Sequence, residues 1–313
     1  MIMAREPRTF DGCLLRFRNT MESEHLAPRT ISFYVETVHA VTEILRAGNR
    51  HVMPAEITRE DVDYLLDYFV EHDFAIQTRK GYLSALRKWC RTSSIGSPAV
   101  HDWPNCRFPH DTRPHADWLT CDQAASLLTH PKTQLQAVVV HLELCLGMRH
   151  CEVIRLRADA IDYSREYLTV TGKGSMGGKP RIIPFTKGTA DLLRTYTETV
   201  RDEQIRRAKA RFPISTTVPP NLILWSRGDR LHAYSEEGYG LDKMVTIPLS
   251  EELGFHFSNH TLRRTFGRAL FRAGVAVPVI AKILGHESTD VTLRYIGVDL
   301  DDMTDALRRL SYD

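Results

Sequence analysis

Residues 167–185, YLTVTGKGSMGGKPRIIPF, decide the fold class because they form a β-type stretch in a chain dominated by helical patterns. Two runs, 167–172 and 181–185, flank a glycine-rich turn, which predicts a β-hairpin. Around this hairpin, apolar residues recur at helical spacing, with prolines at several starts and glycines at several ends. We therefore predict a mainly α protein with a small antiparallel sheet.

Upstream of the hairpin, the first hundred residues predict four helices and no strand. These helices cover 9–26, 28–48, 57–72 and 77–93. Residues 95–116 then break the pattern with four prolines and no periodicity, which is typical of a linker. We therefore predict a helical domain over 5–95, a linker over 96–115 and a second domain over 116–313, with a tail helix over 300–313.

The second domain is predicted to be helical on both sides of the hairpin. Residues 119–130 and 189–211 are expected to be helical, and 134–161 form a long apolar helix that breaks near Gly147. Residues 223–234, ILWSRGDRLHAY, are expected to be irregular. Three short helices, 258–274, 277–285 and 289–297, each end on a glycine.

Composition excludes several classes of protein. The 313 residues are 42% apolar and 26% charged, so the chain can bury a core and is not disordered. No apolar run has the length of a membrane span, and the N-terminus lacks a secretory pattern, so we expect no membrane contact and a cytoplasmic location. The six cysteines are scattered and are expected to be reduced thiols.

Charge is balanced overall but segregated along the chain. The net charge of +2 argues neither for nor against nucleic acid. Residues 56–73 carry seven acids against one base, whereas 79–91 carry five bases and no acid. Such separation favours one face directed at a polyanion, although solvated helix faces would give the same pattern.

Several polar residues stand in structured or apolar surroundings, and together they suit chemistry at a phosphate. They are Arg149, Lys173, His260, Arg263, His286 and Tyr295. Two arginines can clamp the oxygens of a phosphate, while a lysine and two histidines can move protons. A tyrosine hydroxyl can attack phosphorus without a metal if its proton is taken and the phosphate charge is neutralised.

In order and spacing these residues closely resemble the tyrosine recombinase (phage integrase) family, of the simple two-domain Xer-like type. GMRHCEVIRL (147–156) resembles its arginine box, TGKGSMGGKPRIIPF (171–185) its lysine hairpin, and HTLRRTF (260–266) its His-x-x-Arg box. LGHESTDVTLRYIGV (284–298) resembles the final histidine–tyrosine box. More weakly, LAPRTISFYVETV (26–38) and IQTRKGYLSALRKWCR (76–91) resemble the helical core-binding domain. The implied fold is that helical domain followed by a mixed α/β, mostly helical catalytic domain.

The resemblance implies a role for each catalytic position. Tyr295 would attack the scissile phosphodiester and form a 3′-phosphotyrosyl bond, and the strands would recombine through a Holliday junction. Arg149 and Arg263 would clamp the phosphate, with His286 bonded to it. Lys173 would protonate the leaving 5′-oxygen and His260 would accept the tyrosine proton. Glu152 would orient the site from behind, and no metal, ATP or other cofactor would be needed.

The resemblance also implies double-stranded DNA as partner. A homotetramer would assemble on synapsed recombination sites from monomers or dimers in solution, and tails such as 300–313 would dock on a neighbouring protomer. The sequence does not indicate whether an accessory protein takes part. The residues expected to contact DNA are the basic strip Arg79, Lys80, Arg87, Lys88 and Arg91, together with Arg29 and Thr30 at the start of the second helix.

Departures from the family pattern are few, and the alternatives explain less. Arg264 stands where many relatives have histidine. A DNA-binding regulator with a helix-turn-helix over 277–295 would leave the other boxes without a purpose. A topoisomerase of type IB chemistry is the other alternative, and the helical first domain favours a recombinase over it.

Two ligand sites suggested by local sequence are weak. The turn at 172–179 fails the phosphate-loop pattern, because Gly178 stands where that pattern needs lysine. The histidines and cysteines around the linker lack the paired spacing of a zinc site; they are His101, Cys106, His110, His115 and Cys121. We therefore predict no metal.

Overall fold

The structure is a computed structural model that describes residues 7–92, 97–104, 117–172, 180–228, 230–236, 239–297 and 302, without the side chain of Arg294. Lys173, most of the predicted linker with Cys106, His110 and His115, and nearly all of the tail over 300–313 lie outside these residues. The chain divides into two compact units, Met1–Arg113 and Pro114–Asp313.

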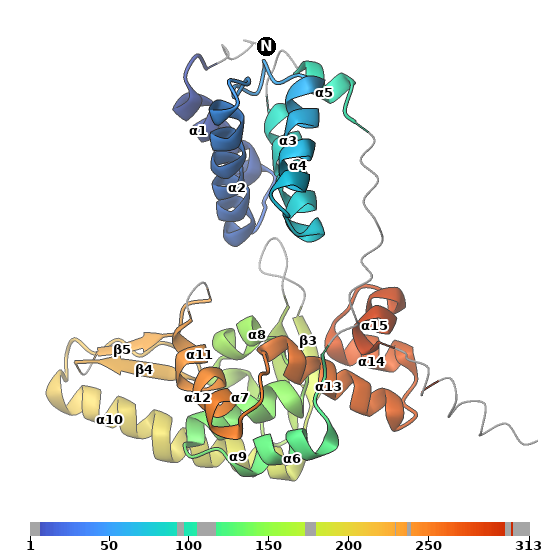
Figure 1. Ribbon diagram of the computed structural model, residues 1–313. Coiled ribbons are helices and arrows are strands. Elements are labelled where there is room, and N and C mark those ends of the chain that lie inside the picture. Colours follow the sequence, from blue (N-terminus) through green and yellow to red (C-terminus); the bar gives the residue numbers. More distant parts are fainter. Residues whose placement is uncertain are drawn as a thin grey trace, which may run out of the picture. The chain divides into compact units, whose positions relative to one another are not determined.

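The first unit is a bundle of helices, drawn in blue and cyan in Figure 1. They are α1 (Phe10–Ser23), α2 (Pro28–Ala47), α3 (Arg59–Glu71), α4 (Ile76–Cys90) and the short α5 (Pro98–His101). Their apolar faces enclose a core around Phe17, Leu45, Leu86 and Trp89, all fully buried. The four long helices confirm the helical interpretation of this part of the chain.

Part of the predicted linker packs on this first unit. Ser97 is buried and donates its hydroxyl to the carbonyl of Ile57 at 2.6 Å, and the backbone N–H of Ala99 reaches the same carbonyl at 3.1 Å. The chain therefore stays attached to the helical bundle through α5, despite its prolines.

The second unit is mostly helical around a small sheet (Figure 1). Its helices are α6 (Cys121–Thr129), α7 (Gln134–Leu144), α8 (His150–Arg155), α9 (Lys187–Tyr196), α10 (Asp202–Arg211), α11 (Gly240–Met244), α12 (Thr246–Leu253), α13 (Asn259–Arg272), α14 (Val277–Leu284) and α15 (Thr289–Ile296). A 3-10 turn spans Ala158–Ala160, and a π-helical turn, Thr197–Arg201, joins α9 to α10. Helix α7 is apolar on almost all sides and packs against α13.

The predicted hairpin is present. Strands β2 (Tyr167–Thr171) and β3 (Pro180–Pro184) pair antiparallel with Leu168 opposite Ile183, and β1 (Ile161–Asp162) adds a short edge to β2. Leu168, Val170 and Ile183 are buried in the core of the second unit. The mainly helical fold with a small antiparallel sheet is therefore confirmed.

The expectation that residues 223–234 are irregular is wrong. They form a second hairpin, β4 (Leu224–Arg227) and β5 (Arg230–Ala233), which lies beside α10 in Figure 1. Leu224 and Leu231 turn inward onto Ala208 of α10, so a small separate core holds two strands that are too short to show a clear alternation. Gly228, with φ of 55°, begins the connection between them.

Within the described ranges, no helix has both the length and the apolarity to cross a bilayer.

Candidate active site

Arg149 lies where the long apolar helix breaks. Gly147 adopts a left-handed φ of 61°, and a Cβ there would lie 2.3 Å from the ring of Phe266, so glycine is required by both conformation and space. The chain turns at this point and restarts as α8, with Arg149 as the residue before its first turn. The guanidinium of Arg149 then reaches the carbonyl of Gly285 at 3.0 Å.

Glu152 binds two arginines, Arg149 and Arg181. It accepts the backbone N–H of Arg149 at 2.8 Å and the Arg149 Nη1 at 2.9 Å. Arg181 of β3 donates to both of its oxygens, at 2.6 and 2.8 Å, and its Nε donates to the carbonyl of Ile283 at 2.9 Å. Burial alone would raise the pKa of Glu152, but the bonds and charge of Arg181 outweigh it and hold that pKa below its usual range.

Arg263 is the most deeply buried of these cations, with 3% of its surface exposed. Its two terminal nitrogens donate to the carbonyls of Gly147 and Leu284, and Nη2 lies 3.4 Å from His286 Nε2. Burial and the nearby Arg149 lower its pKa to about 10, so it remains a cation at neutral pH. Arg263 therefore joins the helix break, the end of α14 and the imidazole that follows it.

His286 is held as a neutral imidazole. Burial and the cations Arg263, Arg149 and Arg181 lower its pKa to about 4. Its Nδ1 lies 2.9 Å from the hydroxyl of the buried Thr292.

Tyr295 lies edge-on to His286, with ring centroids 5.0 Å apart. The guanidiniums of Arg263 and Arg264 lie 5.9 and 5.5 Å from the centre of its ring. Burial raises the pKa of Tyr295, although the two arginines oppose that effect, so the phenol is protonated at neutral pH and needs a base. Its hydroxyl donates to the backbone carbonyl of His260 at 3.5 Å.

The structure therefore brings five of the sequence-predicted residues together. Arg149, Glu152, Arg263 and His286 are linked by the contacts above, and Tyr295 contacts two of them. His260 is exposed and lies one helical turn before Arg263 on α13. Lys173 lies outside the described residues.

Arg181 and Thr292 were not among the site residues predicted from sequence. Arg181 follows the turn of the hairpin, and strand alternation places it on the same face as the buried Ile183, which was the available signal. Thr292 was missed because a threonine inside a short helix carries no distinguishing pattern.

The helix that carries Tyr295 is anchored at its C-terminal end. Arg268 of α13 is buried and donates to the carbonyls of Ile296 and Gly297 at 3.2 and 2.6 Å. Its guanidinium stacks 3.9 Å from the ring centre of Trp118. Because α15 has only eight residues, this anchor fixes the position of the tyrosine more than helix propensity can.

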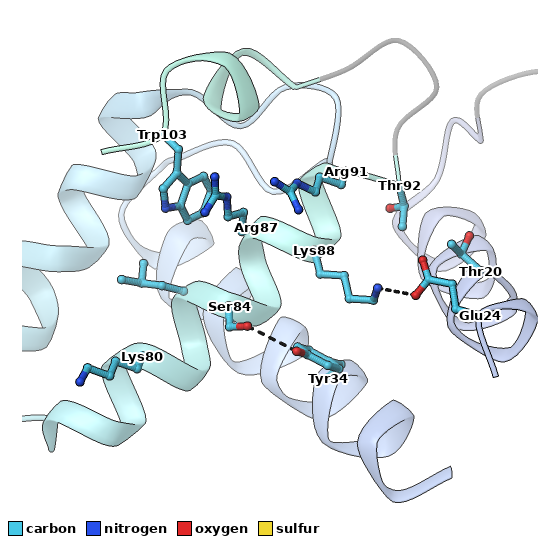
Figure 2. Close-up of a pocket in the computed structure, with 11 residues that line it drawn as sticks. Thr20, Glu24, Tyr34, Lys80, Ser84, Arg87, Lys88, Arg91, Thr92 and Trp103 are labelled. Carbon is cyan, nitrogen blue, oxygen red and sulfur yellow. Dashed lines mark hydrogen bonds and ion pairs between the residues drawn. The ribbon is translucent and has the colours of Figure 1, made fainter. Parts of the chain in front are cut away.

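The first unit carries a basic groove of about 560 Å³, shown in Figure 2. Four of the predicted DNA-contacting residues line it: Lys80, Arg87, Lys88 and Arg91. Lys88 pairs at 2.5 Å with Glu24, the residue that follows α1, and the Arg87 guanidinium lies 5.6 Å from the ring centre of Trp103.

The other three predicted DNA-contacting residues do not line this groove. Arg29 and Thr30 lie in the first turn of α2, with Arg29 exposed. Arg79 donates its Nε to the carbonyl of Phe74 at 2.6 Å, which directs part of its guanidinium toward the backbone.

Across the described residues, no three histidine, cysteine, aspartate or glutamate side chains come together as a metal site.

Comparisons with known proteins all point to the same family. The sequence profile of the Phage integrase family matches residues 117–301, and that of the phage integrase N-terminal SAM-like domain matches residues 13–91. The tyrosine recombinase XerC of Pelobacter propionicus is 28% identical over 297 residues, covering 91% of this chain and 90% of its own. XerA of Thermococcus kodakarensis is 23% identical, covering 93% and 92%.

Solved structures agree on the fold. XerH bound to a palindromic difH substrate, in a post-cleavage complex, has a TM-score of 0.64 at 13% identity, covering 97% of this chain and 85% of that one. The Tn1549 transposon integrase in complex with a circular intermediate DNA has a TM-score of 0.63 at 15% identity, covering 95% and 99%. At these identities the likeness concerns the fold.

Proposed function

The chain belongs to the phage integrase family of tyrosine recombinases, and from that premise we propose that it is a site-specific DNA recombinase that acts through a 3′-phosphotyrosyl intermediate and a Holliday junction. The observation that carries the proposal is the mutual contact of Arg263, His286 and Tyr295, with Arg149 bonded to the same turn at Gly285. A nucleophile beside two fixed cations is the arrangement that phosphoryl transfer needs.

The proposed reaction is a transesterification. The Tyr295 oxygen bonds to the scissile phosphorus while the bond from phosphorus to the 5′-oxygen breaks. Arg149 and Arg263 stabilise the charge that develops on the non-bridging oxygens, where paired guanidinium donors fit best. The reverse reaction with a different 5′-hydroxyl rejoins the strands, so the covalent link conserves the bond energy and no ATP is consumed.

Proton transfer is assigned to three groups. His260 accepts the Tyr295 proton, and the 3.5 Å contact between the tyrosine hydroxyl and the His260 backbone keeps the two residues adjacent. Lys173 gives a proton to the leaving 5′-oxygen. His286 hydrogen-bonds the phosphate, whose negative charge would oppose the arginines and raise the low pKa of that imidazole. None of these steps requires a metal ion.

Double-stranded DNA is the proposed partner of both units. The groove of Figure 2 presents Lys80, Arg87 and Arg91 with exposed or partly exposed cationic ends, as phosphate contacts require. XerH was solved bound to a palindromic difH substrate, and the Tn1549 transposon integrase in complex with a circular intermediate DNA. Arg29, Thr30 and Arg79 remain proposed contacts outside the groove.

We propose a homotetramer on two synapsed sites, with the tail over 300–313 docking on a neighbouring protomer. Helices α14 and α15 expose three apolar side chains, with 40–49% of their surface accessible: Val279, Val291 and Leu293. These side chains form an apolar surface on which such a tail can dock. Deleting 303–313, which keeps Asp302 and its 3.0 Å ion pair with Arg268, should spare cleavage of a nicked site but impair synapsis; equal loss of both activities would contradict this arrangement.

Covalent trapping tests the proposed chemistry. The recombination site is first selected by binding from randomised duplexes, and nicked duplexes carrying it are then incubated with the protein in chelator. We expect a denaturation-resistant protein–DNA adduct that Tyr295→Phe abolishes. A tight, specific complex without any adduct would favour a DNA-binding regulator, and relaxation of supercoiled DNA without strand exchange would favour a topoisomerase.

A further inference from the structure

A second ionic cluster, formed by Glu143, His150 and Asp242, includes the residue that follows Arg149 in the chain and has no part in the reaction described above. Glu143 of α7 is completely buried, and its Oε1 bonds to Nδ1 of His150 at 2.8 Å. The other ring nitrogen of His150 lies 3.7 Å from Oδ1 of Asp242 in α11. The imidazole, carried by α8, therefore lies between one carboxylate from α7 and one from α11 (Figure 1).

Asp242 continues the cluster to the start of α13. Its Oδ1 accepts the side-chain amide of Asn259 at 2.8 Å and the hydroxyl of Thr246 at 3.2 Å. Thr246 also lies 3.0 Å from the amide oxygen of Asn259. One carboxylate oxygen therefore faces both His150 and Asn259.

The two ends of this cluster are each one residue from a proposed catalytic side chain. His150 is the first residue of α8 and follows Arg149, and Asn259 is the first residue of α13 and precedes His260. A chain of polar contacts thus joins the starts of two helices that are more than a hundred residues apart in sequence. Displacing either helix start would displace Arg149 or His260 with it.

Stability alone does not account for such a cluster. Placing a carboxylate in the core carries a large desolvation cost, and apolar side chains of similar volume commonly stabilise such a site as well or better. Glu143 Oε2 and His150 Nε2 also lack a hydrogen-bond partner among the described residues, which adds to the cost. Directed polar contacts do provide one property that apolar packing lacks, which is a fixed geometry between the parts they join.

We propose that His150 is a positioning residue for DNA strand cleavage: held between Glu143 and Asp242, it fixes the starts of α8 and α13 so that Arg149 and His260 face the same phosphate. This inference rests on the proposed recombinase function. His150 and its two carboxylate partners touch no substrate and act through the helix starts.

The charge state of the cluster agrees with this role. Burial alone would lower the pKa of His150, but the hydrogen bond and charge of Glu143, together with Asp242, outweigh it and raise that pKa. Burial also raises the pKa of Glu143. A protonated imidazole donates from Nδ1 to Glu143 at 2.8 Å, and its positive charge faces Asp242 across 3.7 Å.

The first measurement is the single-turnover cleavage rate of a nicked duplex carrying the recombination site, at saturating protein. His150→Ala should slow cleavage by about 100-fold, the effect of misplacing a catalytic group by ~1 Å, while DNA affinity changes little. His150→Asn keeps a donor near the Nδ1 position and should recover part of the rate. The exposed His256 provides the control, and His256→Ala should cleave at the wild-type rate.

A substrate change separates positioning from damage to the fold. A methylphosphonate at the scissile position removes the negative charge that Arg149 is proposed to neutralise. A misplaced Arg149 should therefore slow cleavage of this substrate much less than cleavage of the ordinary phosphodiester. The penalty of His150→Ala, measured as strand cleavage, should therefore shrink at least tenfold on this substrate. An equal penalty on both substrates would mean that fewer molecules are active, and would overturn the proposal.

Asp242→Asn provides a second variant if His150→Ala does not fold, because it keeps an oxygen for Asn259 but removes the charge facing His150. It should show the same substrate-dependent penalty at smaller size, and a uniform penalty would again contradict the proposal. Failure of the recombinase assignment looks different. In that case the wild-type chain itself would give no adduct that depends on Tyr295.

Discussion

Replacing Glu152 by glutamine should destabilise the second unit by about 3 kcal/mol. The Glu152 side chain has no exposed surface, and its two bonded arginines, Arg181 and Arg149, keep 12% and 24% of theirs. Removing one partner of a buried ion pair costs ~3–5 kcal/mol, and the partial exposure of Arg149 places this case near the lower end. In Glu152→Gln, the cations Arg149, Arg181 and Arg263 lose the anion that they share. The amide N–H group of the new glutamine must also face a guanidinium, which can donate hydrogen bonds but cannot accept them.

Calorimetry of the full chain measures this effect as a shift in melting temperature. A loss of 3 kcal/mol in a unit of this size corresponds to a decrease of ~6–12 °C. Glu251→Gln, at an exposed position, is the matched control and should melt within ~2 °C of wild type, as surface substitutions usually do. A decrease in Glu152→Gln no larger than in this control would refute the reasoning.

The dependence of this effect on pH provides an independent check. The folded-state pKa of Glu152 lies below its ordinary value of 4.5, so the carboxylate contributes stability above pH 4.5 that is lost as the pH falls through the folded-state pKa. Glu152→Gln cannot lose that contribution. The difference in stability between the two proteins should therefore narrow below pH 4.5, and a constant difference would argue against the ion pair as its cause.

Three further predictions concern the backbone, a histidine and the basic groove. Gly147→Ala combines a left-handed φ with overlap of the Phe266 ring, so it should cost at least ~2 kcal/mol in denaturant unfolding; a neutral result would be inconsistent with this turn. The pKa of His286 is lowered to about 4, so folding loses stability as pH falls from 6.5 toward 4; His286→Asn should lose less over that range, and an identical loss would count against a buried neutral imidazole. Lys80→Ala and Lys88→Ala should each weaken DNA binding at all sequences and reduce the salt slope by up to about 1; unchanged slopes would remove the groove from the DNA interface.

Much of the fold follows from local patterns. The helices of the first unit each present an apolar stripe with a proline or threonine near the start, and these signals act within a few residues of one another. The β2–β3 hairpin is equally local. The β4–β5 hairpin was mispredicted because its strands gain their apolar contacts from α10, which lies elsewhere in the sequence.

For the candidate site, too, local sequence predicts one part and tertiary packing decides the other. The motifs around Arg149, Arg263, His286 and Tyr295 are short, so the sequence names these residues and their order without knowing their distances. Their contacts with one another depend on how α8, α13, α14 and α15 pack. The sequence gives no sign that His286 is neutral, because its pKa depends on cations brought close by that packing.

The sequence by itself therefore determined the fold class, the helical and hairpin segments and the family, because each depends on the spacing of nearby residues. Only the tertiary structure decided that Arg181 binds Glu152 across 29 residues, and that His150 lies between Glu143 and Asp242. The physical reason is that a buried charge is stable only beside its partner, and which partner it meets is set by the packing of distant segments, not by local spacing.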